Sequence, residues 1–226
     1  MDLASAWETH AGQWIEWARE PGHDGFWEGT WPALRQLLPA PGTVVLDLGC
    51  GEGRLSRELS ALGHRVVGIE RSPTLARAAR SHPLPVSVAL GDAALLPLRD
   101  GAVDLAVACM CLQDLDRLDV ATAEMARVIR RGGSLLVALV HPVANCAPDP
   151  STMSGDRLTV SEPYLVERRM ETHIERAGLE MTFVSVHRPL SRYVRSLAQA
   201  GFVISDLGEQ GAGILPWLLT LIAERR

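Results

Sequence analysis

Three acidic side chains, each at the end of a strand-like run, are the residues of this chain best suited to hold a polar ligand. They are Asp47, Glu70 and Asp92, and the runs cover residues 44–48, 65–69 and 86–90. An acid at the tip of a second strand, roughly 20 residues after a glycine-rich turn, can hydrogen-bond ribose hydroxyls. An acid after the third strand can accept a hydrogen bond from an adenine amino group. The spacing predicts a nucleoside site built from three successive strand ends.

A glycine-rich turn follows the first of these runs, with Gly49, Gly51 and Gly53 at alternate positions. Glycine between a strand and a helix lets a ligand approach the backbone closely, because no Cβ stands in the way. The N-terminus of the following helix presents unpaired N–H groups that suit a carboxylate. The turn departs from the dinucleotide fingerprint G-x-G-x-x-G/A, because Arg54 stands where the third glycine or alanine belongs. This departure disfavours an NAD-dependent enzyme.

Strand-like and helical patterns alternate along the chain. Strands are expected at 44–48, 65–69, 86–90, 103–109 and 134–140, and helices at 54–62, from 72 onward, and at 119–130, where Gly132 and Gly133 stop the helix. Two strand-like pieces around 176–178, a helix at 189–200 and strands at 202–207 and 215–223 follow. Such alternation predicts a parallel sheet with right-handed crossovers, whose ligands lie beyond the carboxyl ends of the strands.

Four segments, in this order, resemble the class I S-adenosylmethionine-dependent methyltransferases: VLDLGCGEG, GIERS, GDAALLPL and VDLAVACMCLQDL. The likeness is strongest to the small-molecule branch that includes ubiquinone and menaquinone methyltransferases. It covers about residues 41–140, and a weaker likeness runs from His187 to the end of the sequence. It implies an α/β fold of three layers, with a doubly wound, Rossmann-like, seven-stranded sheet that is mostly parallel and has an antiparallel last strand. We expect one domain over 1–226, with a helical lid at 1–40 and an insertion near the substrate site at 142–188.

The resemblance implies S-adenosyl-L-methionine as the cofactor and S-adenosyl-L-homocysteine as the product. The acid and glycines of the first turn are expected to line the methionine moiety. Glu70 is expected to hold the ribose, and Asp92 with Ala93 the adenine. The complete implied set is Asp47, Gly49, Cys50, Gly51, Glu70, Arg71, Asp92, Ala93 and Cys109.

The N-terminal segment is rich in tryptophan, and five of the six tryptophans lie within the first 31 residues. Trp7, His10, Trp14 and Trp17 recur at the spacing of one helix face. The stripe either packs against the edge of the sheet or forms a lid that excludes water from an apolar acceptor. Residues 142–157 lose periodicity, which predicts a mobile loop near the site. The substrate-binding candidates are Trp14, Trp17, Gln113 and His141.

Methyl transfer requires an acceptor aligned with the donor in the absence of water, and a base only where the acceptor must lose a proton. The candidate catalytic residues are His141 at the end of the fifth strand, His10 on the tryptophan stripe, and Tyr193. Each of them can instead be a structural hydrogen-bonding residue. Gln113 and Asp114, just past the fourth strand, are candidates for substrate contact or for loop and cap roles.

Composition and charge limit the classes of molecule on which the protein is expected to act. All 22 basic residues are arginine and the net charge is −5, with no basic stripe, which disfavours a nucleic-acid substrate. The four cysteines form no disulfide or zinc pattern, so no metal is expected. The first residues carry no basic leader, and no apolar run has membrane length. We therefore expect a cytoplasmic protein that acts on a small molecule, while its oligomeric state stays open.

Methyl transfer to a small, partly apolar molecule, aromatic ones included, is the function that these residues favour. A non-catalytic cofactor-binding or regulatory protein of the same fold, an NAD-dependent oxidoreductase, and an RNA or protein methyltransferase remain alternatives. The acids at the strand ends argue against the first, and Arg54 argues against the second. The absence of a basic stripe and of an N-P-P-Y motif at the fourth strand argues against the third.

Overall fold

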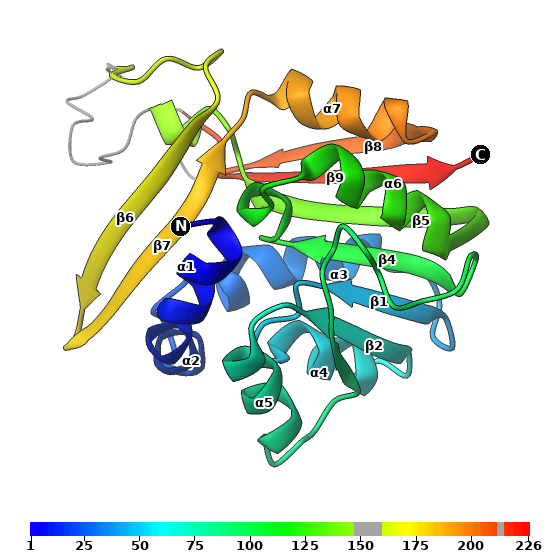
Figure 1. The fold of residues 1–226 in the computed structure, drawn as a ribbon, viewed down its shortest axis with the longest axis horizontal. Coiled ribbons are helices and arrows are strands. Elements are labelled where there is room, and N and C mark those ends of the chain that lie inside the picture. Colours follow the sequence, from blue (N-terminus) through cyan, green and yellow to red (C-terminus); the bar gives the residue numbers. More distant parts are fainter. Residues whose placement is uncertain (147–159, 212–214) are drawn as a thin grey trace.

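The computed structural model describes residues 1–146, 160–211 and 215–226, and its main body is one seven-stranded sheet (Figure 1). The strand order is β3-β2-β1-β4-β5-β9-β8. The strands are β1 (Val44–Leu48), β2 (Arg65–Glu70), β3 (Val88–Leu90), β4 (Val103–Cys109), β5 (Ile129–Val140), β8 (Phe202–Gln210) and β9 (Leu218–Arg225). Strands β1 to β5 are parallel, and β9 runs antiparallel to both β5 and β8. The predicted α/β class and antiparallel last strand are confirmed.

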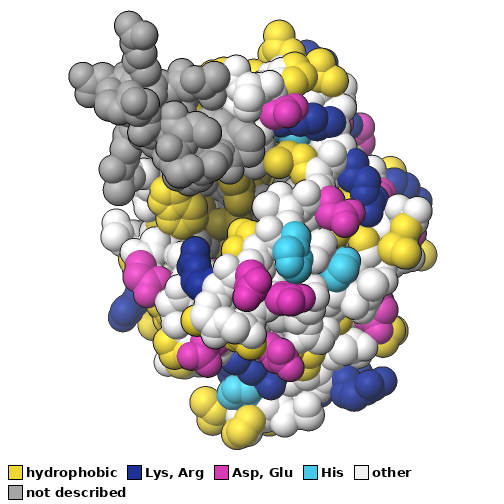
Figure 2. Space-filling view, turned by 90° about the vertical axis from the view of Figure 1, so that its left-hand side faces the viewer, with side chains coloured by type: hydrophobic (Ala, Val, Ile, Leu, Met, Phe, Trp, Pro, Cys, Tyr) yellow, Lys and Arg dark blue, Asp and Glu magenta, His cyan; other side chains and the backbone are white. Residues whose placement is uncertain are grey.

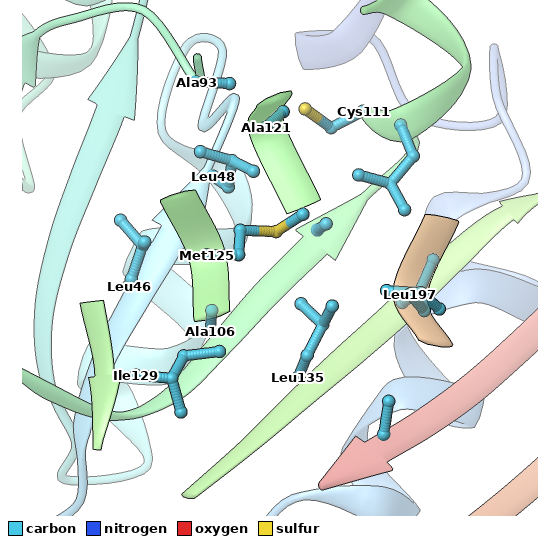
Figure 3. Packing of buried hydrophobic residues seen from close by; sticks show 14 of the residues in the cluster. Leu46, Leu48, Ala93, Ala106, Cys111, Ala121, Met125, Ile129, Leu135 and Leu197 are labelled. Carbon is cyan, nitrogen blue, oxygen red and sulfur yellow. The ribbon is translucent and has the colours of Figure 1, made fainter. Parts of the chain in front are cut away.

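Helices cover both faces of the sheet, because successive strand residues bury side chains on opposite sides. Leu46 and Leu48 pack with helices α6 (Leu118–Val128) and α7 (Leu190–Gln199), as Figure 3 shows for the centre of this cluster. Val45 on the opposite side packs with α3 (Trp31–Leu37) and α4 (Arg54–Ala61). Helix α5 (Pro73–Ser81) contacts β2 and β3, and Ser72 caps it as its position before Pro73 predicts.

The glycine pair at 132–133 was predicted to stop a helix at 130, and this prediction is wrong. Helix α6 ends at Val128, and the pair lies inside β5, where the pairing with β4 slips by several residues. A Cβ on Gly133 would approach the carbonyl oxygen of Asp104 to 2.6 Å. The glycines therefore let an irregular strand start pass close to its neighbour.

Outside the main sheet, β6 (Arg168–Arg176) and β7 (Leu179–His187) form an antiparallel hairpin, as the sequence around 176–178 predicts. Helices α1 (Leu3–Thr9) and α2 (Ala11–Arg19) pack against β7, and a π-helix, η1 (Phe26–Thr30), precedes α3 (Figure 1). The tryptophan stripe does not occupy one helix, because the chain breaks at His10, which ends α1 and begins α2.

Two further expectations concern mobility and membranes. The loop predicted to be mobile, residues 142–157, lies mostly outside the described residues; its beginning contains the short helix η3 (Ala144–Cys146). Among the helices of the described ranges, none has the length and apolarity needed to cross a membrane.

Candidate active site

A cavity of about 640 Å³ lies at the carboxyl ends of β1, β2 and β4, between the sheet, the N-terminal helices and the β6–β7 hairpin. This is where the order of the parallel strands reverses, between β1 and β4, and where such sheets bind ligands. Every residue predicted to bind the cofactor lines the cavity: Asp47, Gly49, Cys50, Gly51, Glu70, Arg71, Asp92, Ala93 and Cys109.

Asp47 is a buried carboxyl at the floor of the cavity. Its Oδ2 accepts a hydrogen bond of 2.6 Å from the Ser56 hydroxyl on α4. Burial raises the pKa of Asp47 to about 7, and the neighbouring Glu70 adds to the rise while the Ser56 bond opposes it. The carboxyl is therefore poised to ionise near neutral pH, and a cationic ligand group beside it would favour the charged form.

Glu70 holds the glycine turn through its carboxylate. Its Oε2 accepts the N–H of Gly51 and its Oε1 accepts the N–H of Ser72, each at 2.8 Å. Burial raises the pKa of Glu70, although these backbone donors oppose the rise. A carboxylate offers about four lone-pair sites, so two remain for ligand hydroxyls. Glu70 can therefore serve the turn and a ligand at once.

Asp92 lies at the more open rim of the cavity. Its Oδ1 accepts the N–H of Ala94 at 2.9 Å, and its Oδ2 lies 3.4 Å from Arg71 and 3.2 Å from Arg117. Exposed ion pairs of this kind contribute little to stability. A ligand amino group can therefore compete with the two arginines for this carboxylate.

The cysteines near the turn are uncharged thiols. Burial raises the pKa of Cys109 to about 12, so its thiol stays protonated at neutral pH. All four cysteines are free. Within the described ranges, no group of three histidine, cysteine or acidic residues is placed to hold a metal ion.

The structure does not bring the predicted base His141 to the cavity. His141 follows β5, but its side chain is buried, with Nε2 2.8 Å from Glu209 Oε1. Its Nδ1 accepts the N–H of Val143, which leaves the proton on Nε2 to be donated to Glu209. His141 thus ties β5 to β8, and the neighbouring Ala144 and Asn145 line the cavity instead.

Three other candidates also lie outside the lining. Tyr193 is buried in the core beside α6, where burial raises its pKa to about 12. His10 meets the side chain of Gln13 at the break between α1 and α2. Trp17 is 2% exposed and packs edge-on against His23 and Phe183. None of these three residues contributes to the cavity lining.

Trp14 and Gln113, the remaining substrate candidates, do line the cavity, together with Asp114. The Trp14 ring packs edge-on against Trp7 and Phe183, so two tryptophans and the hairpin share one apolar wall. The Oε1 atom of Gln113 is buried and has no hydrogen-bond partner among the described residues. This amide oxygen is an acceptor available to a ligand N–H or O–H.

Several residues that line the cavity were not predicted from the sequence as site residues: Asp24, Phe26, Arg54, Met110, Met170, Thr172, Ile174, Phe183 and Trp217. The residues of the hairpin had a readable signal, because 170, 172 and 174 alternate along one face of a strand. No sequence signal marked Met110, which adopts a left-handed φ of 51° directly after β4. Backbone strain of this kind concentrates at functional sites.

The side of the molecule that carries the hairpin is shown in Figure 2. Acidic and arginine side chains are interspersed there around a group of apolar side chains. The apolar side chains that line the cavity from the N-terminal helices and the hairpin include Trp7, Trp14, Met170, Ile174 and Phe183. The cavity thus has a polar floor at the strand ends and an apolar opposite wall.

The pH dependence of stability provides a test of the Asp47 environment. Its unfolded pKa is about 3.9, so from there to about 7 the folded protein keeps a proton that the unfolded chain has lost. The free energy of unfolding should therefore fall as pH rises through this window, by at most roughly 1.4 kcal/mol per pH unit. Asp47→Asn should flatten this decline, as measured by urea unfolding between pH 4.5 and pH 8.

Asp104→Asn is a matched control for this measurement, because the Arg130 guanidinium holds the pKa of Asp104 below its usual value. The contribution of the Asp104 carboxylate to the free energy of unfolding is lost only as pH falls through that lowered pKa, which lies below the window between about 3.9 and about 7. Equal declines in wild type and Asp47→Asn would contradict the assigned environment.

Comparison with known proteins agrees with this geometry. Residues 46–137 match a family model described as a methyltransferase domain. The chain is 36% identical over 96 residues to the malonyl-acyl-carrier protein O-methyltransferase of Serratia marcescens, covering 42% of this chain and 38% of that protein. It is 34% identical over 116 residues to the demethylmenaquinone methyltransferase of Corynebacterium kroppenstedtii, covering 51% and 49%. The chain thus spans half or less of the length of these two relatives.

A solved structure extends the comparison to nearly the whole chain. The S-adenosylmethionine-dependent methyltransferase of Mesorhizobium loti superposes with a TM-score of 0.71 at 23% identity, covering 88% of this chain and 99% of that one. Residues 46–137 therefore match a methyltransferase domain, and the fold of the chain is that of the Mesorhizobium loti structure.

Proposed function

We propose that this chain transfers a methyl group from S-adenosyl-L-methionine to a small, partly apolar molecule, aromatic ones included. One observation carries the proposal: the glycine turn and the acids Asp47, Glu70 and Asp92 converge on one cavity whose opposite wall is apolar. The matched domain and the names of the relatives from Serratia and Corynebacterium support methyl transfer.

The residues of the polar floor fit the cofactor. A Cβ at Gly51 would lie 3.3 Å from Trp14 Nε1, so glycine keeps a narrow space open between the turn and this ring. Glu70 suits a ribose diol, and Asp92 suits an amino group at the rim. Asp47 suits an ammonium group, because a cation favours its ionised form. The cofactor supplies an electrophilic methyl group on a sulfonium, so little covalent help is required from the protein.

The apolar wall suits the acceptor. Trp7, Trp14 and Phe183 form a chain of edge-on contacts, and Trp217 adds a further ring. Such a wall excludes water and stacks on flat groups, which aligns an acceptor with the donor. We infer that the segment 1–40 and the insertion 142–188 act as the acceptor-side part of a single domain.

A non-catalytic protein of the same fold is the second candidate, and it is favoured by the placement of the histidines. His10 and His141 are held by Gln13 and Glu209 outside the cavity lining. An acceptor that is already nucleophilic needs no base, so this placement is compatible with catalysis as well. Incubation with acceptor pools separates the two: methyl transfer predicts formation of S-adenosylhomocysteine that depends on the pool, and the second candidate predicts none.

Glu70→Gln tests the floor of the site. The amide keeps the size of the side chain, but its NH2 group cannot accept a hydrogen bond. The variant therefore lacks the charged acceptor for either the ribose hydroxyls or the N–H of Gly51. We expect a loss of about 1.5–3 kcal/mol in S-adenosylmethionine binding, measured by calorimetry. The structure also predicts lower stability, because Glu70 holds the N–H groups of Gly51 and Ser72.

Asp104→Asn also serves as the control here, since Asp104 caps the N–H of Val44 at the opposite end of β1. It should lower stability with no change in cofactor affinity. Unchanged affinity in Glu70→Gln would overturn the ribose assignment.

A further inference from the structure

Arg54 occupies an unusual place for a cation, as the first residue of α4 directly after Gly53. The N-terminus of a helix carries partial positive charge, so an arginine there is unfavourable unless other groups compensate. Its side chain is only 13% exposed and lines the cavity. The compensation therefore comes from groups packed around the guanidinium.

All of these groups belong to the N-terminal segment. The Arg54 guanidinium donates to both carboxylate oxygens of Asp24, at 3.1 and 2.6 Å, and to the carbonyl oxygen of Ala18 at 2.9 Å. Its Cζ lies 3.9 Å from the centroid of the Phe26 ring and 5.8 Å from that of Trp14. A two-pronged bond to a carboxylate combined with stacking on a ring uses the planar shape of arginine, which lysine lacks.

The same contacts join the two halves of the cavity. Arg54 directly follows the glycine turn of the polar floor, while Phe26 and Trp14 belong to the apolar side of the lining. Trp14 also comes within reach of the turn itself, at 3.3 Å from the position of a Gly51 Cβ. A shift of the turn that moved the start of α4 would therefore move the guanidinium that Asp24 and Phe26 contact.

We propose that Arg54 is a positioning residue that couples occupancy of the glycine turn to the placement of the N-terminal segment over the acceptor side of the cavity. The proposal rests on the proposed function for the identity of the ligand. A ligand that fixes the turn fixes α4 and its first residue, and through Arg54 it fixes the segment from Ala18 to Phe26. Because such coupling is reciprocal, loss of the Arg54–Asp24 pair also weakens binding at the turn.

Hydrogen exchange of residues 11–31, with and without S-adenosylmethionine, tests the coupling. In the wild type the ligand should slow exchange of this segment by about tenfold. Arg54→Gln and Asp24→Asn should exchange faster without ligand and lose most of the ligand-dependent slowing. Arg54→Lys keeps the positive charge but lacks the planar guanidinium, so it should show only part of the ligand-dependent slowing seen in the wild type. Exchange in β4 and β5 reports whether each variant has folded.

Arg192→Gln is the matched control, because Arg192 makes the same two-pronged contact with Asp119 at 2.6 and 2.7 Å, between α7 and α6. It should leave the exchange of residues 11–31 unchanged. Arg54→Gln with wild-type exchange in that segment, or an equal effect of Arg192→Gln, would overturn the proposal. A wild type that binds no S-adenosylmethionine would contradict the proposed function instead, and wild-type exchange of residues 11–31 in ligand-free Arg54→Gln would then still overturn the role of Arg54.

Discussion

Gly51→Val is expected to lower the affinity for S-adenosylmethionine by more than about 100-fold, which corresponds to about 2.7 kcal/mol. Gly51 has a φ of 58°, which a β-branched residue adopts only with strain, and its Cβ position is 3.3 Å from Trp14 Nε1. The added side chain would fill the space between the turn and the apolar wall. Calorimetric titration measures the loss directly.

The effect of backbone strain at a positive φ must be separated from the effect of filling the cavity. Gly201→Val is the matched control, because Gly201 has a φ of 88°, with no atom within 4 Å of its Cβ position. Both variants should lose about 1–3 kcal/mol of unfolding free energy. Only Gly51→Val should lose binding. A folded Gly51→Val protein with wild-type affinity would show that the turn is merely a connection.

Deletion of residues 1–18 is expected to leave the seven-stranded sheet folded and to abolish turnover. The segment packs mainly outside that sheet: Leu3 and Ala6 pack with Val184, and Trp7 Nε1 donates to the Val184 carbonyl oxygen at 3.0 Å. Its removal takes away Trp7 and Trp14, and with them much of the apolar wall. Circular dichroism and urea unfolding report the fold, and formation of S-adenosylhomocysteine with an acceptor pool reports turnover.

Trp14→Ala in the full chain is the companion variant, because it removes one ring of the wall while the helices stay in place. It should reduce turnover with smaller loss of stability than the deletion. Wild-type turnover in the truncated protein would place the acceptor elsewhere. Failure of the truncated protein to fold would show that α1 and α2 belong to the core. One contact of α1 with the main body is the hydrogen bond of 2.7 Å that the Thr74 hydroxyl on α5 donates to Glu8.

The polar floor could be predicted from the sequence because its signals are local. Asp47, Glu70 and Asp92 follow or end short apolar runs, and a parallel sheet brings the carboxyl ends of its strands to one edge. The turn glycines were readable for the same reason. Nine residues carried over from a resemblance to a family therefore line one cavity.

The positions of the candidate bases and of the apolar wall depend on contacts between distant segments. A strand end places His141 near the cavity, but its orientation is set by Glu209, 68 residues further along the chain. The Arg54–Asp24 pair joins positions 30 residues apart with no periodicity between them. Gly132 and Gly133 looked like a helix stop because glycine ends helices more often than it bends strands. Tertiary packing decides these side-chain orientations and the local structure at the glycines, and it cannot be derived from a single sequence.

We expect the cavity to bind S-adenosyl-L-methionine through its polar floor. Calorimetric titration of the full chain with S-adenosylmethionine, S-adenosylhomocysteine and NAD in parallel measures this binding. We expect saturable one-to-one binding of the first two compounds, lost in Gly51→Val and retained in Gly201→Val, with no heat from NAD. Binding of NAD, or no binding of either S-adenosyl compound by the folded protein, would contradict it.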